Sequence, residues 1–284
     1  MASLDQRQCK EKSEVTGSPT SEGPIHIERR GAIEILSLDR PDALNTLDEP
    51  LTFALRDYFA GLGERLDVRV VVLRAEGRAF CAGLDLAGWE NDGSRGELQH
   101  YWRLQRAIAG LLELMRACPQ PIIGLGHGAA CGAGFSMLLA CDVRYGAPNL
   151  KMNAAYIKVG LGGCDLGCSY FLPRLVGASV ASEYILTGRF MAADKAESCG
   201  LLSEVVPVEE LLDKGLELAG EMVANAPMGL RLTKDALNRN LDARSLSDAM
   251  AVEDRQQVMM LMSEDFAEGV AAFREKRAPE YRDR

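Results

Sequence analysis

The sequence predicts a layered α/β fold, and three observations lead to this prediction. Residues 68–73 and 122–125 are too apolar for strands with one solvated face, and they suit a sheet buried on both faces. Each run is followed by a turn of small residues. A segment with helical periodicity comes next. Because this alternation of strand, turn and helix is typical of layered domains, we expect an α/β core.

The elements before residue 165 follow one another in a simple order. Residues 25–38 alternate β-branched and polar residues around Arg30-Gly31, which indicates a hairpin. Residues 39–42 form a turn. The remaining segments are a helix at 47–62, a strand at 68–73, a helix at 97–116 that ends before two prolines, a strand at 122–125, a helix at 134–140 and a strand at 142–145.

The character of the chain changes after about residue 165, where helical periodicity replaces the alternation of strands and helices. We therefore predict a core at residues 24–205 and a C-terminal helical region at 206–284. The predicted helices are 166–176, 179–186, 193–198, 208–224, 228–240, 245–262 and 265–276.

Length and composition limit the classes of protein that the chain can belong to. Its 284 residues, 47% hydrophobic and 26% charged, suit a soluble globular protein. No apolar run approaches the roughly 20 residues of a membrane span. The net charge of −9 argues against nucleic acid as the main partner. Residues 1–23 are polar and lack the apolar core of a secretory signal, so we expect a disordered tail.

The eight cysteines are scattered among apolar residues. This pattern favours buried free thiols over a disulfide framework, and it indicates a reducing compartment such as the cytoplasm. Cys164 and Cys168 have no cysteine or histidine partners nearby in the sequence, so no metal site is expected.

Two turns of small residues carry the first functional hypothesis. They span residues 77–86 and 128–134, and each follows an apolar run. Each turn can direct a backbone N–H into one pocket, which is how many enzymes stabilise a developing oxyanion. The same pattern is also compatible with two ordinary turns between a strand and a helix.

The segment Ala79-Phe80-Cys81-Ala82-Gly83-Leu84-Asp85-Leu86 resembles the first signature of the crotonase (enoyl-CoA hydratase/isomerase) superfamily. Further blocks of similarity extend from Ile25 to Arg282. The resemblance implies a crotonase-type spiral of ββα units, with C-terminal helices that form a homotrimer or a hexamer of paired trimers. It also implies an acyl-CoA thioester as substrate, whose enolate the backbone N–H groups of Leu84 and Ala133 stabilise.

The resemblance also implies which residues contact CoA. CoA arrives as part of the substrate, so no metal or redox cofactor is expected. Its expected contacts are the turn formed by Arg40, Asp42, Ala43 and Leu44, the backbone around Ala79 and Ala82, and Phe273 with Lys276, an element that often borders the CoA of a neighbouring subunit.

The chain departs from the family at the acid–base residues. A typical hydratase of this family holds one water between two glutamates, and those positions are Ser136 and Tyr156 here. A hydroxyl group whose pKa is near 10 or above cannot serve unaided as a general base at neutral pH. The two-glutamate hydration scheme is therefore not expected. Tyr156 can instead hydrogen-bond a ligand or simply pack, and Ser136 can pack or bond back to the turn.

Asp165 is the candidate replacement. Residues 160–170 resemble the branches of the family that place a working aspartate here, among them dienoyl-CoA isomerases and 4-chlorobenzoyl-CoA dehalogenases. Asp165 could transfer a proton or attack as a nucleophile. However, the dehalogenase histidine position falls near Ala109, and the partner carboxylate of the isomerases falls on Tyr156. The alternative is that Asp165 only caps the following helix.

Two hypotheses for function follow from these residues. The first is an acyl-CoA enzyme of the hydratase/isomerase type with altered acid–base residues. The second is an acyl-CoA-binding protein that has lost its chemistry.

Trp89 is expected to line the acyl pocket. At most two of the consecutive residues His100, Tyr101 and Trp102 are expected to line it as well, because three consecutive helical residues do not share one face.

Overall fold

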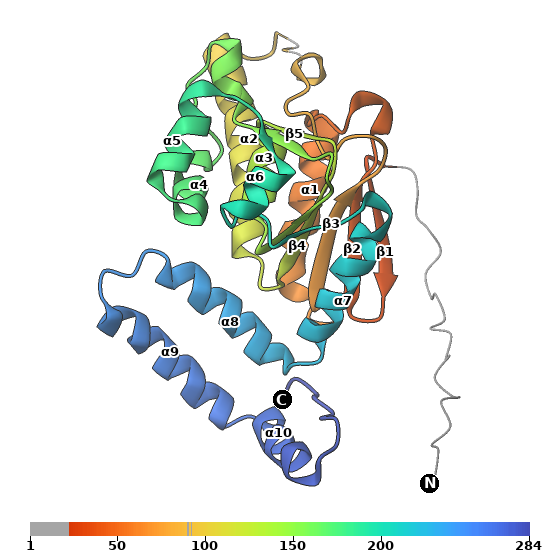
Figure 1. The fold of residues 1–284 in the computed structure, drawn as a ribbon, viewed down its shortest axis with the longest axis vertical. Helices are drawn as coiled ribbons and strands as arrows, with labels where there is room; N and C mark the ends of the chain where they lie inside the picture. The colour runs from red at the N-terminus through yellow and green to blue at the C-terminus, as the bar shows by residue number, and fades with distance from the viewer. Residues whose placement is uncertain (1–22, 90, 92) are drawn as a thin grey trace.

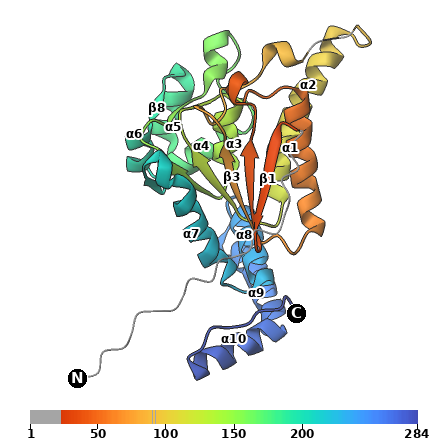
Figure 2. The same ribbon diagram turned by 90° about the vertical axis from the view of Figure 1, so that its right-hand side faces the viewer.

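The computed structural model of the chain describes residues 23–89, 91 and 93–284. A six-stranded sheet in the order β1-β2-β3-β4-β6-β9 forms its centre. Figures 1 and 2 show helices packed around the strands. β1 and β2 pair as the predicted antiparallel hairpin, and every other pair in this sheet is parallel. The strands are β1 (Ile25–Arg30), β2 (Ile33–Leu38), β3 (Val70–Ala75), β4 (Ile122–Gly126), β6 (Val143–Gly146) and β9 (Glu204–Val205).

Both faces of this sheet are buried, as the apolar runs predict. In β3, Val71 and Leu73 pack into a large cluster that includes residues of α1 (Glu49–Gly61), α2 (Glu97–Ala117) and α3 (Ala133–Ala140). Val70 and Val72 point to the opposite face, where α7 (Leu211–Val223) covers the sheet. Figure 2 shows the strands between α7 on one side and α1 and α2 on the other. The fold is therefore the layered α/β arrangement that the sequence predicts.

A second, small sheet was not predicted. It consists of β5 (Ala129–Cys131), β7 (Lys151–Asn153) and β8 (Met191–Ala192) in that order. Strands of two or three residues are too short to show an alternation of apolar and polar side chains, so sequence periodicity could not reveal them. This sheet matters for function because β5 lies within the second turn of small residues.

The predicted helices after residue 165 are all present, with ends that differ by up to three residues. They are α4 (Cys168–Val176), α5 (Ala178–Thr187), α6 (Ala193–Ser198), α7, α8 (Pro227–Asn240), α9 (Leu246–Leu261) and α10 (Glu264–Glu275). In Figure 1, α8 and α9 run side by side below the sheet, and α10 lies at the far end of the molecule. Among the described residues, no helix is long and apolar enough to cross a membrane. The predicted tail at residues 1–23 falls outside the described residues except for Gly23, and the predicted boundary at 206 stays a prediction.

Candidate functional site

The two turns of small residues lie against each other in the structure. Backbone hydrogen bonds run from Phe80 N to His127 O (2.9 Å) and from Cys81 N to Ala129 O (3.0 Å), and Cys131 N returns one to Cys81 O (3.0 Å). This short parallel ladder joins segments about 50 residues apart in the sequence. The ladder therefore fixes the segments that follow β3 and β4 beside one another, so that both turns border the same space.

Two glycines permit this close approach. A Cβ atom on Gly134 would lie 2.2 Å from Cys81 O, well inside any real contact distance. Gly83 has a φ of +111°, a backbone conformation that side chains disfavour, and a Cβ there would lie 3.1 Å from Cys131 O. The small residues therefore serve the contact between the turns, and they are not merely loop residues.

A cavity of about 870 Å³ opens where the turns meet. Leu84 from the first turn and Ala133 from the second both line it. Ala133 is the first residue of α3, so its N–H has no acceptor within that helix. Within the described part of the chain, neither the Leu84 N–H nor the Ala133 N–H donates a backbone hydrogen bond. Two residues whose N–H groups donate no backbone hydrogen bond therefore line one cavity. Two such groups directed at one point could bind a carbonyl oxygen that gains negative charge.

Ser136 and Tyr156 form a buried pair at this cavity. Their hydroxyl oxygens lie 2.8 Å apart, Ser136 is fully buried and Tyr156 is 7% exposed. Tyr156, in the short 3₁₀ segment Ala155–Val159, lines the cavity. Burial raises the pKa of Tyr156 well above 10, and the hydrogen bond with Ser136 opposes this only partly. Tyr156 therefore keeps its proton at neutral pH and can donate a hydrogen bond, but it cannot act as a base.

Asp165 lines the same cavity as Leu84, Ala133 and Tyr156. Its Oδ1 accepts hydrogen bonds from Gln105 Nε2 (2.6 Å) and from the backbone N of Leu166 (2.7 Å). The helix-cap alternative is wrong, because α4 begins at Cys168 with Gly167 as its N-cap residue, and no side chain caps it. Sequence reasoning placed the helix start two residues too early and so assigned the cap to Asp165.

The helix α2 supplies the largest share of the residues that line the cavity. Trp89 lines the cavity as predicted, and its indole Nε1 donates to Leu47 O (3.0 Å). The expectation that at most two of His100, Tyr101 and Trp102 reach the cavity is wrong, since all three line it. His100 is buried, with Nε2 3.0 Å from Trp89 O, whereas Tyr101 and Trp102 are largely exposed. The N-terminal turns of α2 thus border the cavity over more than one helix face.

Sequence reasoning missed Glu97 and Asn45. Glu97, in the first turn of α2, is the second carboxylate among the residues that line the cavity. Asn45 is fully buried and links the segment after Arg40 to the first turn, because its Nδ2 donates to Ala79 O (2.9 Å) and to Glu76 O (2.9 Å). Glu97 stands in no pattern that separates it from ordinary surface residues. Asn45 belongs to the Ala43-Leu44-Asn45 block of the family resemblance, but nothing in that block indicated its buried hydrogen bonds.

The structure brings some of the residues predicted to contact CoA together. Ala82 N donates to Leu44 O (3.0 Å), and Ala82 also lines the cavity. Ala79 is buried beside this turn, and Asp42 and Ala43 belong to the short 3₁₀ segment Pro41–Ala43. The guanidinium of Arg40 is already paired with Asp48 (2.9 Å) and Asp85 (3.3 Å), so a phosphate would compete with two carboxylates.

The structure does not bring Phe273 and Lys276 to the cavity of their own chain. Phe273 lies on α10 and is 85% exposed, and Lys276 follows the end of the same helix. Figure 1 shows α10 at the end of the molecule remote from α2 and β5. Any contact of these residues with CoA would therefore involve the cavity of another chain.

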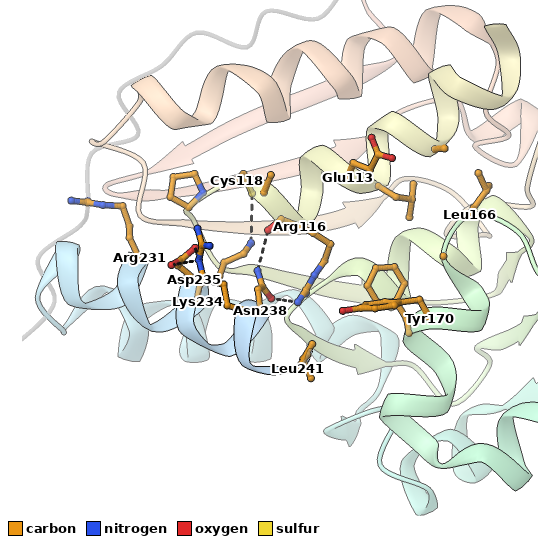
Figure 3. Close-up of a pocket in the computed structure, with 17 residues that line it drawn as sticks. Glu113, Arg116, Cys118, Leu166, Tyr170, Arg231, Lys234, Asp235, Asn238 and Leu241 are labelled. Atoms are coloured by element: carbon orange, nitrogen blue, oxygen red, sulfur yellow. Dashed lines mark hydrogen bonds and ion pairs between the residues drawn. The ribbon is translucent and has the colours of Figure 1, made fainter. Parts of the chain in front are cut away.

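A second cavity, of about 650 Å³, lies between α2, α4 and α8 (Figure 3). Its buried Lys234 is bound to Asp142 Oδ2 (2.9 Å) and Gln120 O (2.7 Å), and Arg116 pairs with Asp142 as well (3.1 Å). Figure 3 shows Arg116 and Asn238 hydrogen-bonded to each other, and Lys234 directed toward Cys118. Because these polar groups satisfy each other, we interpret them as the anchor that fixes α8 to the core. No group of three or more potential metal ligands occurs among the described residues.

Comparison with known proteins gives a consistent result. Residues 28–284 match the model of the enoyl-CoA hydratase/isomerase family. The chain is 36% identical over 264 residues to a probable enoyl-CoA hydratase of Mycobacterium bovis, covering 89% of this chain and 90% of the relative. It is 29% identical over 254 residues to a crotonyl-CoA hydratase of Syntrophomonas wolfei, covering 89% and 95%.

A solved enoyl-CoA hydratase from Bacillus anthracis superposes with a TM-score of 0.86 at 30% identity, covering 92% of this chain and all of that one. The spiral of strands and helices is thus the crotonase fold. The chain belongs to the enoyl-CoA hydratase/isomerase family, within the crotonase superfamily.

Proposed function

We propose that this protein catalyses proton transfer beside the carbonyl group of an acyl-CoA thioester, with Asp165 as the acid and base. The observation that carries the proposal is that Asp165 lines the same cavity as the two free N–H groups of Leu84 and Ala133. These N–H groups would bind the thioester oxygen as it becomes an enolate oxygen, and the N-terminal end of α3 would add its positive dipole end. CoA enters with the substrate, so the reaction requires no other cofactor.

Isomerisation is the reaction that one carboxylate can perform alone. Asp165 removes a proton from one carbon, the electron pair moves onto the thioester oxygen, and the protonated Asp165 returns a proton to another carbon as the double bond shifts. Hydration by the family's scheme needs two carboxylates that hold a water, and Ser136 and Tyr156 supply hydroxyl groups instead. Tyr156 would donate a hydrogen bond to the ligand or hold its position in the wall.

The test is deuterium exchange. The protein is incubated with a panel of enoyl-, dienoyl- and aryl-CoA thioesters in deuterated water, and incorporation is followed by mass spectrometry. We expect incorporation with the natural chain and its loss with Asp165→Asn. The control is Asp57→Asn, the same change at an exposed position of α1. Incorporation that survives Asp165→Asn removes Asp165 as the base.

A second candidate function is acyl-CoA binding without turnover, which the replacement of both glutamates by a buried hydroxyl pair favours. It predicts tight binding of acyl-CoA in calorimetry and an unchanged ligand by mass spectrometry. Turnover or exchange of any thioester in the panel contradicts it.

We also infer that the chain assembles as a homotrimer or as a hexamer of two trimers in the cytoplasm. The support is that α9 has no buried residue in the single chain, although it carries large apolar side chains. The exposed ones are Leu246, Met250, Val258, Met259 and Leu261. An assembly through α8, α9 and α10 would cover this surface and would give Phe273 and Lys276 a neighbour's CoA to contact. Sedimentation at several protein concentrations tests the assembly, and a monomer at every concentration contradicts it.

A further inference from the structure

The two carboxylate oxygens of Asp165 have different surroundings. Oδ1 accepts both hydrogen bonds that the structure gives this side chain, one from Gln105 Nε2 (2.6 Å) and one from Leu166 N (2.7 Å). Within the described residues, no hydrogen bond is directed to Oδ2. Because two donors hold one oxygen, the carboxylate cannot rotate freely, and only Oδ2 is available to a ligand.

The donor from Gln105 comes from outside the local chain. Gln105 lies in the middle of α2, 60 residues before Asp165, and it lines the cavity. The donor from Leu166 is part of the adjacent backbone, where Leu166 adopts a φ of +45°. The Leu166 N–H can fix Asp165 only as well as its own loop is fixed, whereas Gln105 ties that loop to a rigid helix of 21 residues.

We propose that Gln105 is the positioning residue of the reaction: it holds Asp165 through Oδ1 so that Oδ2 faces the acyl group in the cavity. This inference rests on the proposed function of Asp165. A carboxamide suits the role because its N–H₂ group donates a hydrogen bond but does not exchange a proton with a carboxylate at any ordinary pH. Gln105 therefore fixes the base without competing for its proton, which a lysine or histidine at the same place would do.

A positioning role can be separated from a packing role. A residue that only packs against the loop would change stability. A residue that orients the base would change the rate of proton transfer and would leave the affinity for acyl-CoA unaltered.

The test uses two variants of Gln105 and one matched control. Gln105→Met keeps the length of the side chain and removes the donor. Gln105→Glu places a second negative charge beside Asp165. Gln99→Met makes the same change as the first variant at an exposed position of the same helix. Each is compared with the natural chain by the rate of deuterium exchange, by acyl-CoA binding, and by the chemical shift of the carbon-13 signal of the Asp165 carboxyl group, assigned with Asp165→Asn.

With Gln105→Met we expect about tenfold slower exchange, unchanged affinity for acyl-CoA, and a changed chemical shift of the Asp165 carboxyl carbon. Gln105→Glu should slow exchange further, and Gln99→Met should change none of the three measurements. An unaltered rate in Gln105→Met, with exchange still abolished in Asp165→Asn, overturns the inference and leaves the proposed function standing. If the natural chain exchanges nothing, the proposed function fails, and the carbon-13 signal still decides the Gln105 contact: an unmoved signal in both Gln105 variants overturns it.

Discussion

The hydroxyl oxygens of Ser136 and Tyr156 lie 2.8 Å apart in a part of the cavity wall from which water is almost excluded. The family resemblance implies that these are the positions of the two glutamates in a typical hydratase. In this chain the two positions hold hydroxyl groups that form a hydrogen bond with each other. This bond gives each of the two buried side chains a polar partner.

The Ser136–Tyr156 hydrogen bond should be visible in stability measurements. Tyr156→Phe leaves the fully buried hydroxyl of Ser136 without this partner, which should cost about 1–3 kcal/mol of the free energy of unfolding. The double variant Ser136→Ala/Tyr156→Phe removes both polar groups and should cost less than the two single changes added together. Urea unfolding of the four proteins measures the coupling, and purely additive costs would refute the bond. Deuterium exchange should persist in Tyr156→Phe, because the raised pKa of Tyr156 excludes it as the base.

Restoring two carboxylates should restore hydration. In Ser136→Glu/Tyr156→Glu, the atoms gained at Ser136 are about as many as those lost at Tyr156, so the cavity wall keeps its volume. We expect hydration of a short enoyl-CoA to rise about 100-fold or more above the natural chain, the usual contribution of general acid–base groups. The loss of ultraviolet absorbance by the enoyl thioester measures it. The control is Ser136→Gln/Tyr156→Gln, which has the same shape without the charge. Equal rates for the Glu and Gln double variants would show that missing carboxylates are not what limits hydration.

Local patterns predicted much of the fold. The buried strand β3 was predicted because five of the six residues 68–73 are apolar. The long helix α2 was predicted because its 3.6-residue periodicity lies within one segment. The strands β5 and β7 were missed because three residues are too few for any period. Their pairing depends on backbone segments that meet only after the core has formed.

The candidate site was predicted to a smaller extent. Leu84, Ala133 and Asp165 came from family resemblance, and the structure brings them to one cavity. The hydrogen bond between Gln105 and Asp165 joins residues 60 positions apart, and no local pattern encodes such a contact. The ion pairs of Arg40 with Asp48 and Asp85 were equally invisible, because a single arginine in a turn is compatible with solvent, a phosphate or a carboxylate.

The contact between the two turns should depend on Gly134. A Cβ atom there would lie 2.2 Å from Cys81 O, so Gly134→Ala forces the turns apart or shifts the start of α3. We expect a loss of about 1–3 kcal/mol in the free energy of unfolding, together with weaker acyl-CoA binding as the Leu84 and Ala133 N–H groups separate. The matched control is Gly220→Ala in α7, where a Cβ would meet nothing within 4 Å and should stabilise the helix by about 0.5–1 kcal/mol. Equal effects of the two substitutions on unfolding would contradict the steric argument.

The buried thiols should make the protein sensitive to alkali. Burial raises the pKa of Cys81 and of Cys141 to about 12, from an ordinary value of 9.0. Above pH 9 the unfolded chain therefore loses these protons while the folded chain still retains them. The stability that the neutral thiols contribute is complete below about pH 9 and is lost as the pH rises toward 12. Each group should lower the free energy of unfolding by about 1.4 kcal/mol per pH unit within this window.

Urea unfolding at several pH values between about 8 and about 11 measures this slope in the natural chain and in two cysteine variants. Cys141→Ala creates a small void and lowers stability at every pH, but it should also make the slope shallower by the contribution of one thiol. Cys164→Ala removes an exposed thiol and serves as the control substitution. The comparison of slopes, rather than of absolute stabilities, isolates the titration from the packing defect. An identical slope in the natural chain and in Cys141→Ala would mean that Cys141 ionises as readily in the folded protein as in the unfolded one, and that water reaches its sulfur in the core.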